Sequence, residues 1–138
     1  MSVNQGNPLP ALAHLLEKKI LRIEIEHLPY TTLSPNSRVH WAVKAQDVKV
    51  SREEIGWLAK AQWQGQPMAK ARISYEFQVK DKRRRDADNL LAMCKPWQDG
   101  LIDAGVITYD DIEHLEIGYI RVLRSDANRS IITVEEVI

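Results

Sequence analysis

Two stretches of the chain alternate apolar and polar residues with the period of a β-strand. In residues 20–27 the apolar positions are Leu21, Ile23 and Ile25, and the residues between them are charged. Residues 71–79 alternate over the whole stretch, with Ala71, Ile73, Tyr75, Phe77 and Val79 on the apolar side. Because successive side chains of a strand point to opposite faces, each stretch predicts a half-buried strand.

Helical spacing and helix-end signals predict two helices. Ser51-Arg-Glu-Glu54 has the form of a capping box, and apolar residues then recur at helical spacing. This pattern predicts a first helix at about 52–64, after a loop at about 29–49. A second helix is expected from near Asp88 to Gly105, kinked at Pro96 because proline has no N–H to donate.

Two further strands are predicted at about 115–123 and 130–137, and we expect them to pair as a hairpin around the turn at 125–128. Residues 1–19 are interpreted as a flexible N-terminal segment, with a short helical turn at 11–19. Residues 20–138 then follow the order β-α-β-α-β-β. This order predicts a single α+β domain with a mixed sheet and two main helices.

The composition is that of an ordinary globular domain, with 44% hydrophobic and 28% charged residues. No apolar run reaches the roughly 18 residues that a membrane-spanning helix requires. The first residues have neither the basic segment nor the apolar core of a secretory signal. The single cysteine, Cys94, can form no internal disulfide. These features predict a cytoplasmic protein that does not associate with membranes.

The net charge is zero, but the charges are distributed unevenly. Five basic residues gather within six positions, and carboxylates dominate the following stretch up to Glu116; the basic residues are Lys80, Lys82, Arg83, Arg84 and Arg85. This arrangement suits a protein that holds phosphates and a metal ion together. On charge alone, a solvated turn between two elements is the better explanation.

Asp86 and Asp88 are predicted where a strand gives way to a helix. Alternate residues of an extended turn point the same way, so both carboxylates can approach one ion. Hard divalent cations such as Mg²⁺ take oxygen ligands and are commonly held by one or two carboxylates with phosphate and water. The Asp110-Asp111 pair, in the turn before the next strand, is the expected source of a third carboxylate.

Lys95 lies seven positions after Asp88 and therefore returns to within about 20° of it on an ideal helix. Asp99 follows on nearly the same face. A lysine beside metal-binding carboxylates can orient water or neutralise the charge of a phosphate. Simpler explanations stay open: Asp88 as a helix N-cap, Asp110-Asp111 as turn residues, and Lys95–Asp99 as a surface pair worth a few tenths of a kcal/mol.

Taken in order, these segments resemble the signature of the RusA family of Holliday-junction resolvases. The resemblance is carried by Arg83-Arg-Arg-Asp86-Ala-Asp88-Asn89-Leu90, Lys95, Asp99-Gly-Leu101 and Val106-Ile107-x-x-Asp110-Asp111. It covers residues 80–113, with a looser similarity in the loop around Pro35-Asn36. Family members often have the lysine where this chain has Ala92, but positions 92 and 95 share one helix face.

The resemblance implies a RusA-like fold and assigns roles to these residues. Asp86, Asp88 and Asp111 would be metal ligands, with Asp110 a further contributor. Lys95 would be the catalytic lysine, and Asn89 would support the site. The basic residues would bind the DNA backbone without reading its sequence; they are Lys82, Arg83, Arg84 and Arg85.

The activity implied is that of a Mg²⁺-dependent endodeoxyribonuclease, with Mn²⁺ able to replace Mg²⁺. Such a protein is a homodimer that binds a four-way DNA junction and nicks two strands symmetrically during recombination and repair. Three alternatives stay open: a nuclease for other branched DNA, a non-catalytic DNA-binding accessory protein of the same fold, and a structural domain whose aspartates only cap helices. The four tryptophans are expected to be core or dimer contacts; they are Trp41, Trp57, Trp63 and Trp97.

Overall fold

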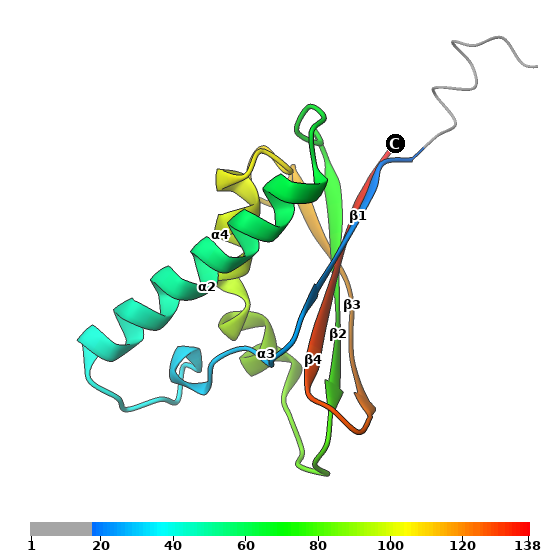
Figure 1. The fold of residues 1–138 in the computed structure, drawn as a ribbon. Coiled ribbons are helices and arrows are strands. Elements are labelled where there is room, and N and C mark those ends of the chain that lie inside the picture. The colour runs from blue at the N-terminus through cyan, green and yellow to red at the C-terminus, as the bar shows by residue number, and fades with distance from the viewer. Residues whose placement is uncertain (1–17) are drawn as a thin grey trace, which may run out of the picture.

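The computed structural model describes residues 18–138. They form a four-stranded mixed sheet with the helices on one face (Figure 1). The strands are β1 (Ile20–Ile25), β2 (Ala71–Val79), β3 (Leu115–Arg124) and β4 (Arg129–Glu136), and the helices are η1 (Thr31–Leu33, 3₁₀), α2 (Trp41–Gln62), α3 (Ala87–Met93) and α4 (Lys95–Asp103). The predicted α+β class and mixed sheet are confirmed. The helical turn expected at 11–19 and the flexible segment at 1–19 fall outside the described residues, apart from Lys18 and Lys19.

The two strands predicted first are confirmed with their faces. In β1 the residues Leu21, Ile23 and Ile25 are buried and their neighbours are exposed. In β2 all five residues on the predicted apolar side are buried. On the opposite face of β2, Ser74 and Glu76 are buried as well, because β2 lies between two other strands.

The predicted hairpin of the last two strands is wrong. The sheet order is β1-β4-β2-β3, so β2 lies between β3 and β4. Tyr75 of β2 pairs with Ile132 of β4 on one side and, in parallel, with Ile120 of β3 on the other. The alternation pattern fixes which face of a strand is buried but not which strand is its neighbour. The more buried β4 takes a central position, and the largely exposed β3 lies at the edge.

Helix α2 begins at Trp41, eleven residues before the predicted start at 52, and the predicted capping box is wrong. His40 is the N-cap, and its Nδ1 accepts a hydrogen bond from the backbone N–H of Ala42 at 3.1 Å. Ser51 is a buried residue inside the helix. The buried positions of α2 begin only at Ser51, so residues 41–50 carry no apolar periodicity that could reveal them as helix.

The predicted second helix is two helices rather than one kinked helix. The break lies at Cys94 (φ −88°, ψ −4°), and Pro96 occupies the first turn of α4. Proline is well tolerated in a first turn because its missing N–H would have no partner there. Gly105, with φ +77°, takes the left-handed position after α4 as predicted.

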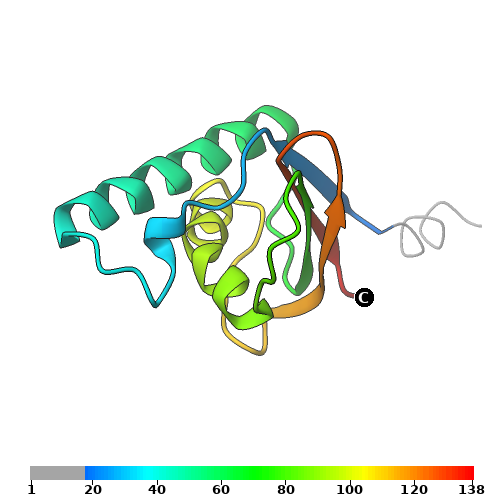
Figure 2. The same ribbon diagram turned by 90° about the horizontal axis from the view of Figure 1, so that it is seen from below.

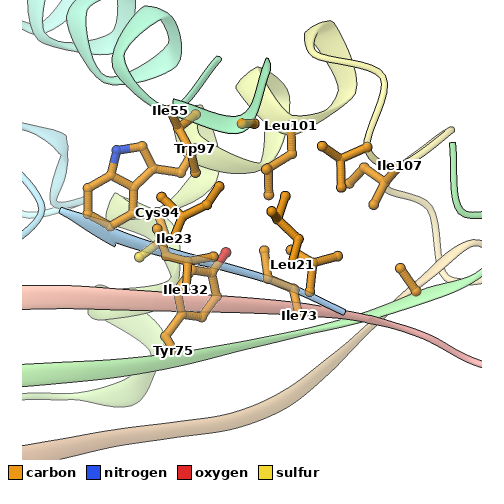
Figure 3. Close-up of a cluster of buried hydrophobic side chains, with 14 of the residues drawn as sticks. Leu21, Ile23, Ile55, Ile73, Tyr75, Cys94, Trp97, Leu101, Ile107 and Ile132 are labelled. Atoms are coloured by element: carbon orange, nitrogen blue, oxygen red, sulfur yellow. The ribbon is translucent and has the colours of Figure 1, made fainter. Parts of the chain in front are cut away.

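The core lies between the sheet and the helical layer (Figure 3). Ile23, Tyr75 and Ile132 from the sheet pack with Ile55 of α2 and Trp97 of α4, all nearly or fully buried. Of the tryptophans expected to be core or dimer contacts, Trp97 lies in the core. Trp41 and Trp57, whose exposed fractions are 75% and 77%, lie outside it.

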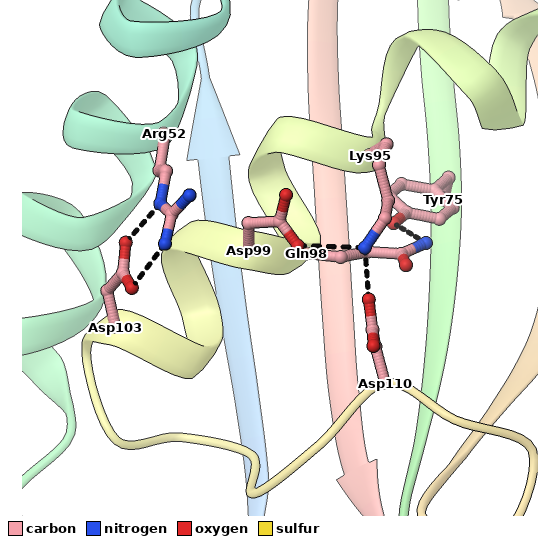
Figure 4. A network of polar contacts seen from close by, with 7 residues as sticks. All are labelled: Arg52, Tyr75, Lys95, Gln98, Asp99, Asp103 and Asp110. Atoms are coloured by element: carbon pink, nitrogen blue, oxygen red, sulfur yellow. Dashed lines mark hydrogen bonds and ion pairs between the residues drawn. The ribbon is translucent and has the colours of Figure 1, made fainter.

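Helices α2 and α4 pack closely and are joined by an ion pair. The Arg52 guanidinium donates to both carboxylate oxygens of Asp103, at 2.5 and 2.8 Å (Figure 4).

None of the helices within residues 18–138 has the length and apolar character needed to span a bilayer.

Candidate active site

The acidic residues Asp86 and Asp88 lie where the segment after β2 enters α3. The N-cap is Asp86 (φ −90°, ψ 134°) and not Asp88, which lies in the first turn. The Asp86 side chain makes no capping hydrogen bond. Both residues are exposed, and within the described part of the chain neither carboxylate forms a hydrogen bond or an ion pair. Helix capping therefore does not occupy these carboxylates, and both remain available to a cation.

Lys95, the first residue of α4, joins two carboxylates from different parts of the chain (Figure 4). Its ammonium donates to Asp99 Oδ1 at 2.8 Å and also to Asp110, in the turn before β3. Partial burial lowers the Lys95 pKa, but the hydrogen bonds to Asp110 and Asp99 together outweigh burial and raise it. The lysine is thus held as a cation between two carboxylates.

The neighbouring carboxylates Asp110 and Asp111 have different partners. Asp110 contacts Lys95, whereas Asp111 Oδ1 accepts hydrogen bonds from the backbone N–H groups of Glu113 and His114, both at 3.1 Å. The His114 ring lies 2.5 Å from the same oxygen. This ring is the main cause that holds the pKa of Asp111 below its usual value. Asp111 therefore stabilises its own turn, as the simpler explanation supposed, and Asp110 is the residue that reaches the lysine.

A shallow hollow of about 530 Å³ brings part of the predicted site together. Asp88 and Lys95 line it, together with Gln98 and Ile117. The Gln98 amide donates to the buried Tyr75 hydroxyl at 3.2 Å (Figure 4). This hydrogen bond holds the Gln98 side chain in place at the hollow. We call this depression, which Asp88 and Lys95 line, the acidic hollow; Asp99 and Asp110 contact Lys95.

Asp86 and Asn89 line a second depression, a groove of about 560 Å³. One wall is the loop 28–37 with η1, and the other is the segment 83–93. Figure 2 shows η1 beside α3, and the two elements are in contact. The floor includes Phe77 and Leu90. We call this the Asn36–Asn89 groove, after one polar residue on each wall.

The basic run differs along its length. The Arg85 guanidinium is nearly buried and binds both oxygens of Asp81, at 2.8 and 2.9 Å. Together with the Arg83 backbone N–H, it holds the pKa of Asp81 well below its usual range. Arg85 thus stabilises the loop, whereas Lys82, Arg83 and Arg84 extend exposed side chains beside the groove.

The structure brings together only some of the predicted metal ligands. Within residues 18–138, no three His, Cys, Asp or Glu side chains are gathered closely enough to hold a metal ion. The donor chemistry nevertheless fits Mg²⁺. Asp86 and Asp88 are hard oxygen donors without partners among the described residues, and Asp110 lies against the Lys95 ammonium.

Two features of the site were not predicted from sequence. His114 lies three positions after Asp111, a spacing that suggests a contact only once the turn is known. The loop 28–37 showed a turn signal and a loose family resemblance around Pro35-Asn36, but neither indicated that it forms a wall of the groove. Cys94 is buried, which raises the pKa of its thiol and leaves it unreactive.

Comparison with known proteins identifies one relative and no family. No family model matches the chain. An uncharacterized protein from Xylella fastidiosa (strain Temecula1 / ATCC 700964) is 35% identical over 80 residues, which cover 55% of this chain and 52% of the relative. The chain thus spans about half the length of the relative it matches. This similarity carries no functional information.

Proposed function

We propose that this protein is a Mg²⁺-dependent endonuclease that cuts branched DNA, as the RusA-type Holliday-junction resolvases do. The observation that carries the proposal is that Lys95 lines one hollow with Asp88 and also contacts Asp110. These residues come from three motifs that are separate in the sequence, and their order is that of the RusA signature. Capping and turn chemistry explain each motif alone but give no reason for them to meet.

The carboxylates would hold the metal ion. Asp86, Asp88 and Asp110 are the candidate ligands whose carboxylates accept no hydrogen bond from a nearby backbone N–H group. Asp111, which accepts two such bonds, would be a further ligand or would hold the turn that carries Asp110. When bound, Mg²⁺ polarises a phosphate and lowers the pKa of an attacking water. Mn²⁺ takes similar ligands and would serve in its place.

Lys95 would act on the phosphate directly. A phosphate that enters the acidic hollow adds negative charge, and Lys95 is the basic residue among those that line it. Charge neutralisation and positioning supply most of the catalysis in phosphoryl transfer. The amide of Asn89 lies beside Asp86 in the groove and would orient groups at this edge.

The exposed basic residues would bind the DNA backbone. Arg83 and Arg84 line the groove next to Asp86, and Lys82 is exposed beside them. Such contacts add affinity that falls with salt and do not read sequence. Arg85 contributes to DNA binding indirectly, because its ion pair with Asp81 stabilises the loop that carries Arg83 and Arg84.

A homodimer would explain paired cuts. Two identical sites related by a two-fold axis match the symmetry of a four-way junction, and paired nicks would serve recombination and repair. Light scattering of the purified protein measures this state directly: a mass of twice the 15.8 kDa chain is expected.

The proposal is tested with a panel of labelled DNA structures in Mg²⁺, namely a four-way junction, a three-way fork, a flap and plain duplex. Paired symmetric nicks in the junction support a resolvase. Cleavage of the fork or flap instead would support a nuclease whose substrate is another branched DNA. Binding without cleavage under Mg²⁺ and Mn²⁺ would contradict the enzymatic proposal and favour a DNA-binding accessory protein.

A further inference from the structure

The Asn36–Asn89 groove has the dimensions and lining of a site for a single nucleotide. We infer that it binds one unstacked nucleotide of the DNA substrate, beside Asp86. This inference rests on the proposed nuclease function and specifies which part of the substrate the site receives. The groove's volume of about 560 Å³ lies in the range of about 300–1,000 Å³ typical of sites for small ligands.

The groove offers apolar side chains for the face of a base, mainly the half-buried Leu28 and Met93. Phe77 and Leu90 lie at its floor and are almost fully buried, with exposed fractions of 1% and 5%. The groove lies between the loop 28–37 and the segment 83–93, so it is bounded on two sides. A base enters such a space only when it leaves the stack, and unstacking costs least where the duplex is already interrupted.

The walls offer amides for the edge of a base. Asn36 on one wall and Asn89 on the other each carry a donor and an acceptor, and in residues 18–138 neither side chain forms a hydrogen bond. The hydroxyls of Ser34 and Ser37 instead accept hydrogen bonds from backbone N–H groups of their own loop, at 3.2 and 3.4 Å. Asparagine pairs readily with base edges because it donates and accepts at once.

The rim offers charge for a phosphate. Arg84 forms no ion pair within the described residues. The Arg83 side chain is 70% exposed and makes one long contact, at 3.8 Å, with Asp81, which Arg85 already binds. Arg85 is fully engaged by Asp81. Two available guanidinium groups beside an apolar floor and two free amides match a nucleotide, which combines an anion, flat apolar faces and a polar edge.

Binding of deoxyadenosine monophosphate (dAMP) and of inorganic phosphate tests the groove without requiring cleavage. Backbone NMR of the whole chain should show dAMP shifts in residues 28–37 and 83–93. Inorganic phosphate should affect only residues near Arg83 and Arg84 and bind more weakly. Arg84→Gln and Asn36→Ala should each weaken dAMP binding by about three- to tenfold. Arg124→Gln, at an exposed arginine of the β3 edge, is the matched control and should bind as wild type does.

A junction with 2-aminopurine at the branch point tests the same inference on DNA, in EDTA so that no cleavage occurs. Wild type should raise the fluorescence as the base leaves the stack, and Asn36→Ala should reduce this rise while the junction remains bound. The inference would be overturned if dAMP shifted no groove resonances and the 2-aminopurine fluorescence did not rise on junction binding. The nuclease proposal would still hold if the same junction were cut once Mg²⁺ was supplied. Groove binding of dAMP without cleavage of any DNA would support the nucleotide site and contradict the nuclease.

Discussion

At the scale of single residues, Lys95 has the contacts that best distinguish catalysis from surface chemistry. Its ammonium lies between Asp99 and Asp110, and its side chain is 54% exposed. Ion pairs at such exposure contribute about 0–1 kcal/mol to stability. Lys95→Met should therefore change the unfolding free energy by no more than this amount.

The same substitution should reduce junction cleavage by about 100-fold or more, because a positioned charge at a phosphate acts mainly on the transition state. Mn²⁺ binding, measured by calorimetry, should persist or tighten, because two carboxylates lose their ammonium partner. Lys60→Met, at an exposed lysine of α2, is the control for general charge effects. Equal cleavage by both variants would mean that Lys95 is only a surface pair.

Asp111 gives a prediction for acid pH. The His114 ring and two backbone N–H groups lower the pKa of its carboxyl in the folded state, although partial desolvation opposes them. The resulting stabilisation is present above the unfolded value of about 3.9 and is lost as pH falls through the folded pKa. Asp111→Asn should therefore melt lower than wild type at pH 7, and the difference should narrow towards pH 3. A difference that stays constant over this range, in thermal melts, would contradict the ionic origin.

At the scale of elements, the contact between α2 and α4 depends on Gly100. A Cβ at this position would lie 2.5 Å from the Arg52 carbonyl oxygen and would also collide with Ile55 Cγ2. Gly100→Ala should destabilise the protein by about 1–3 kcal/mol, the usual cost of overpacking. Gly56 on the facing helix is the control, because its added Cβ would meet only the Gly100 carbonyl oxygen at 3.8 Å.

Gly56→Ala should be neutral or stabilising by up to about 1 kcal/mol, since alanine favours a helix over glycine. Urea unfolding of the two variants against wild type measures both effects. If Gly100→Ala were as stable as Gly56→Ala, the close approach of α2 and α4 would be wrong.

The two halves of α2 should differ in local stability. The buried residues of this helix are all at Ser51 or beyond, and residues 41–50 extend with exposed or half-buried side chains. Hydrogen bonds without buried contacts open more readily. Native-state hydrogen exchange should therefore be faster at 45–50 than at 55–60. Equal protection of the two halves would indicate that another surface covers the first half.

The sequence predicts the elements best where burial leaves a periodic trace. Residues 71–79 and 20–25 alternate because one face of each packs on the core, and both strands were predicted. The first half of α2 buries nothing and was missed. The neighbours of β4 could not be predicted, since pairing depends on which strands bury the most surface once all are present.

At the scale of the whole molecule, the sequence predicts which residues carry the chemistry better than how they are arranged. Asp88 and Lys95 line one hollow, as their helical spacing suggested, even though Cys94 divides the helix between them. That Asp110 rather than Asp111 reaches Lys95 was not predictable, because the choice depends on the turn that His114 and Asp111 form. The groove joins segments about 50 residues apart, which no local pattern reveals.

The measurement that tests the central claim most directly is cleavage of a synthetic four-way junction in Mg²⁺ by wild type and Asp88→Asn. Asp88 is exposed and has no partner among residues 18–138, so the variant should fold and bind the junction as wild type does. The account predicts paired nicks by wild type and a loss of at least about 100-fold in the variant. Undiminished cleavage by Asp88→Asn, or no cleavage by folded wild type, would contradict it.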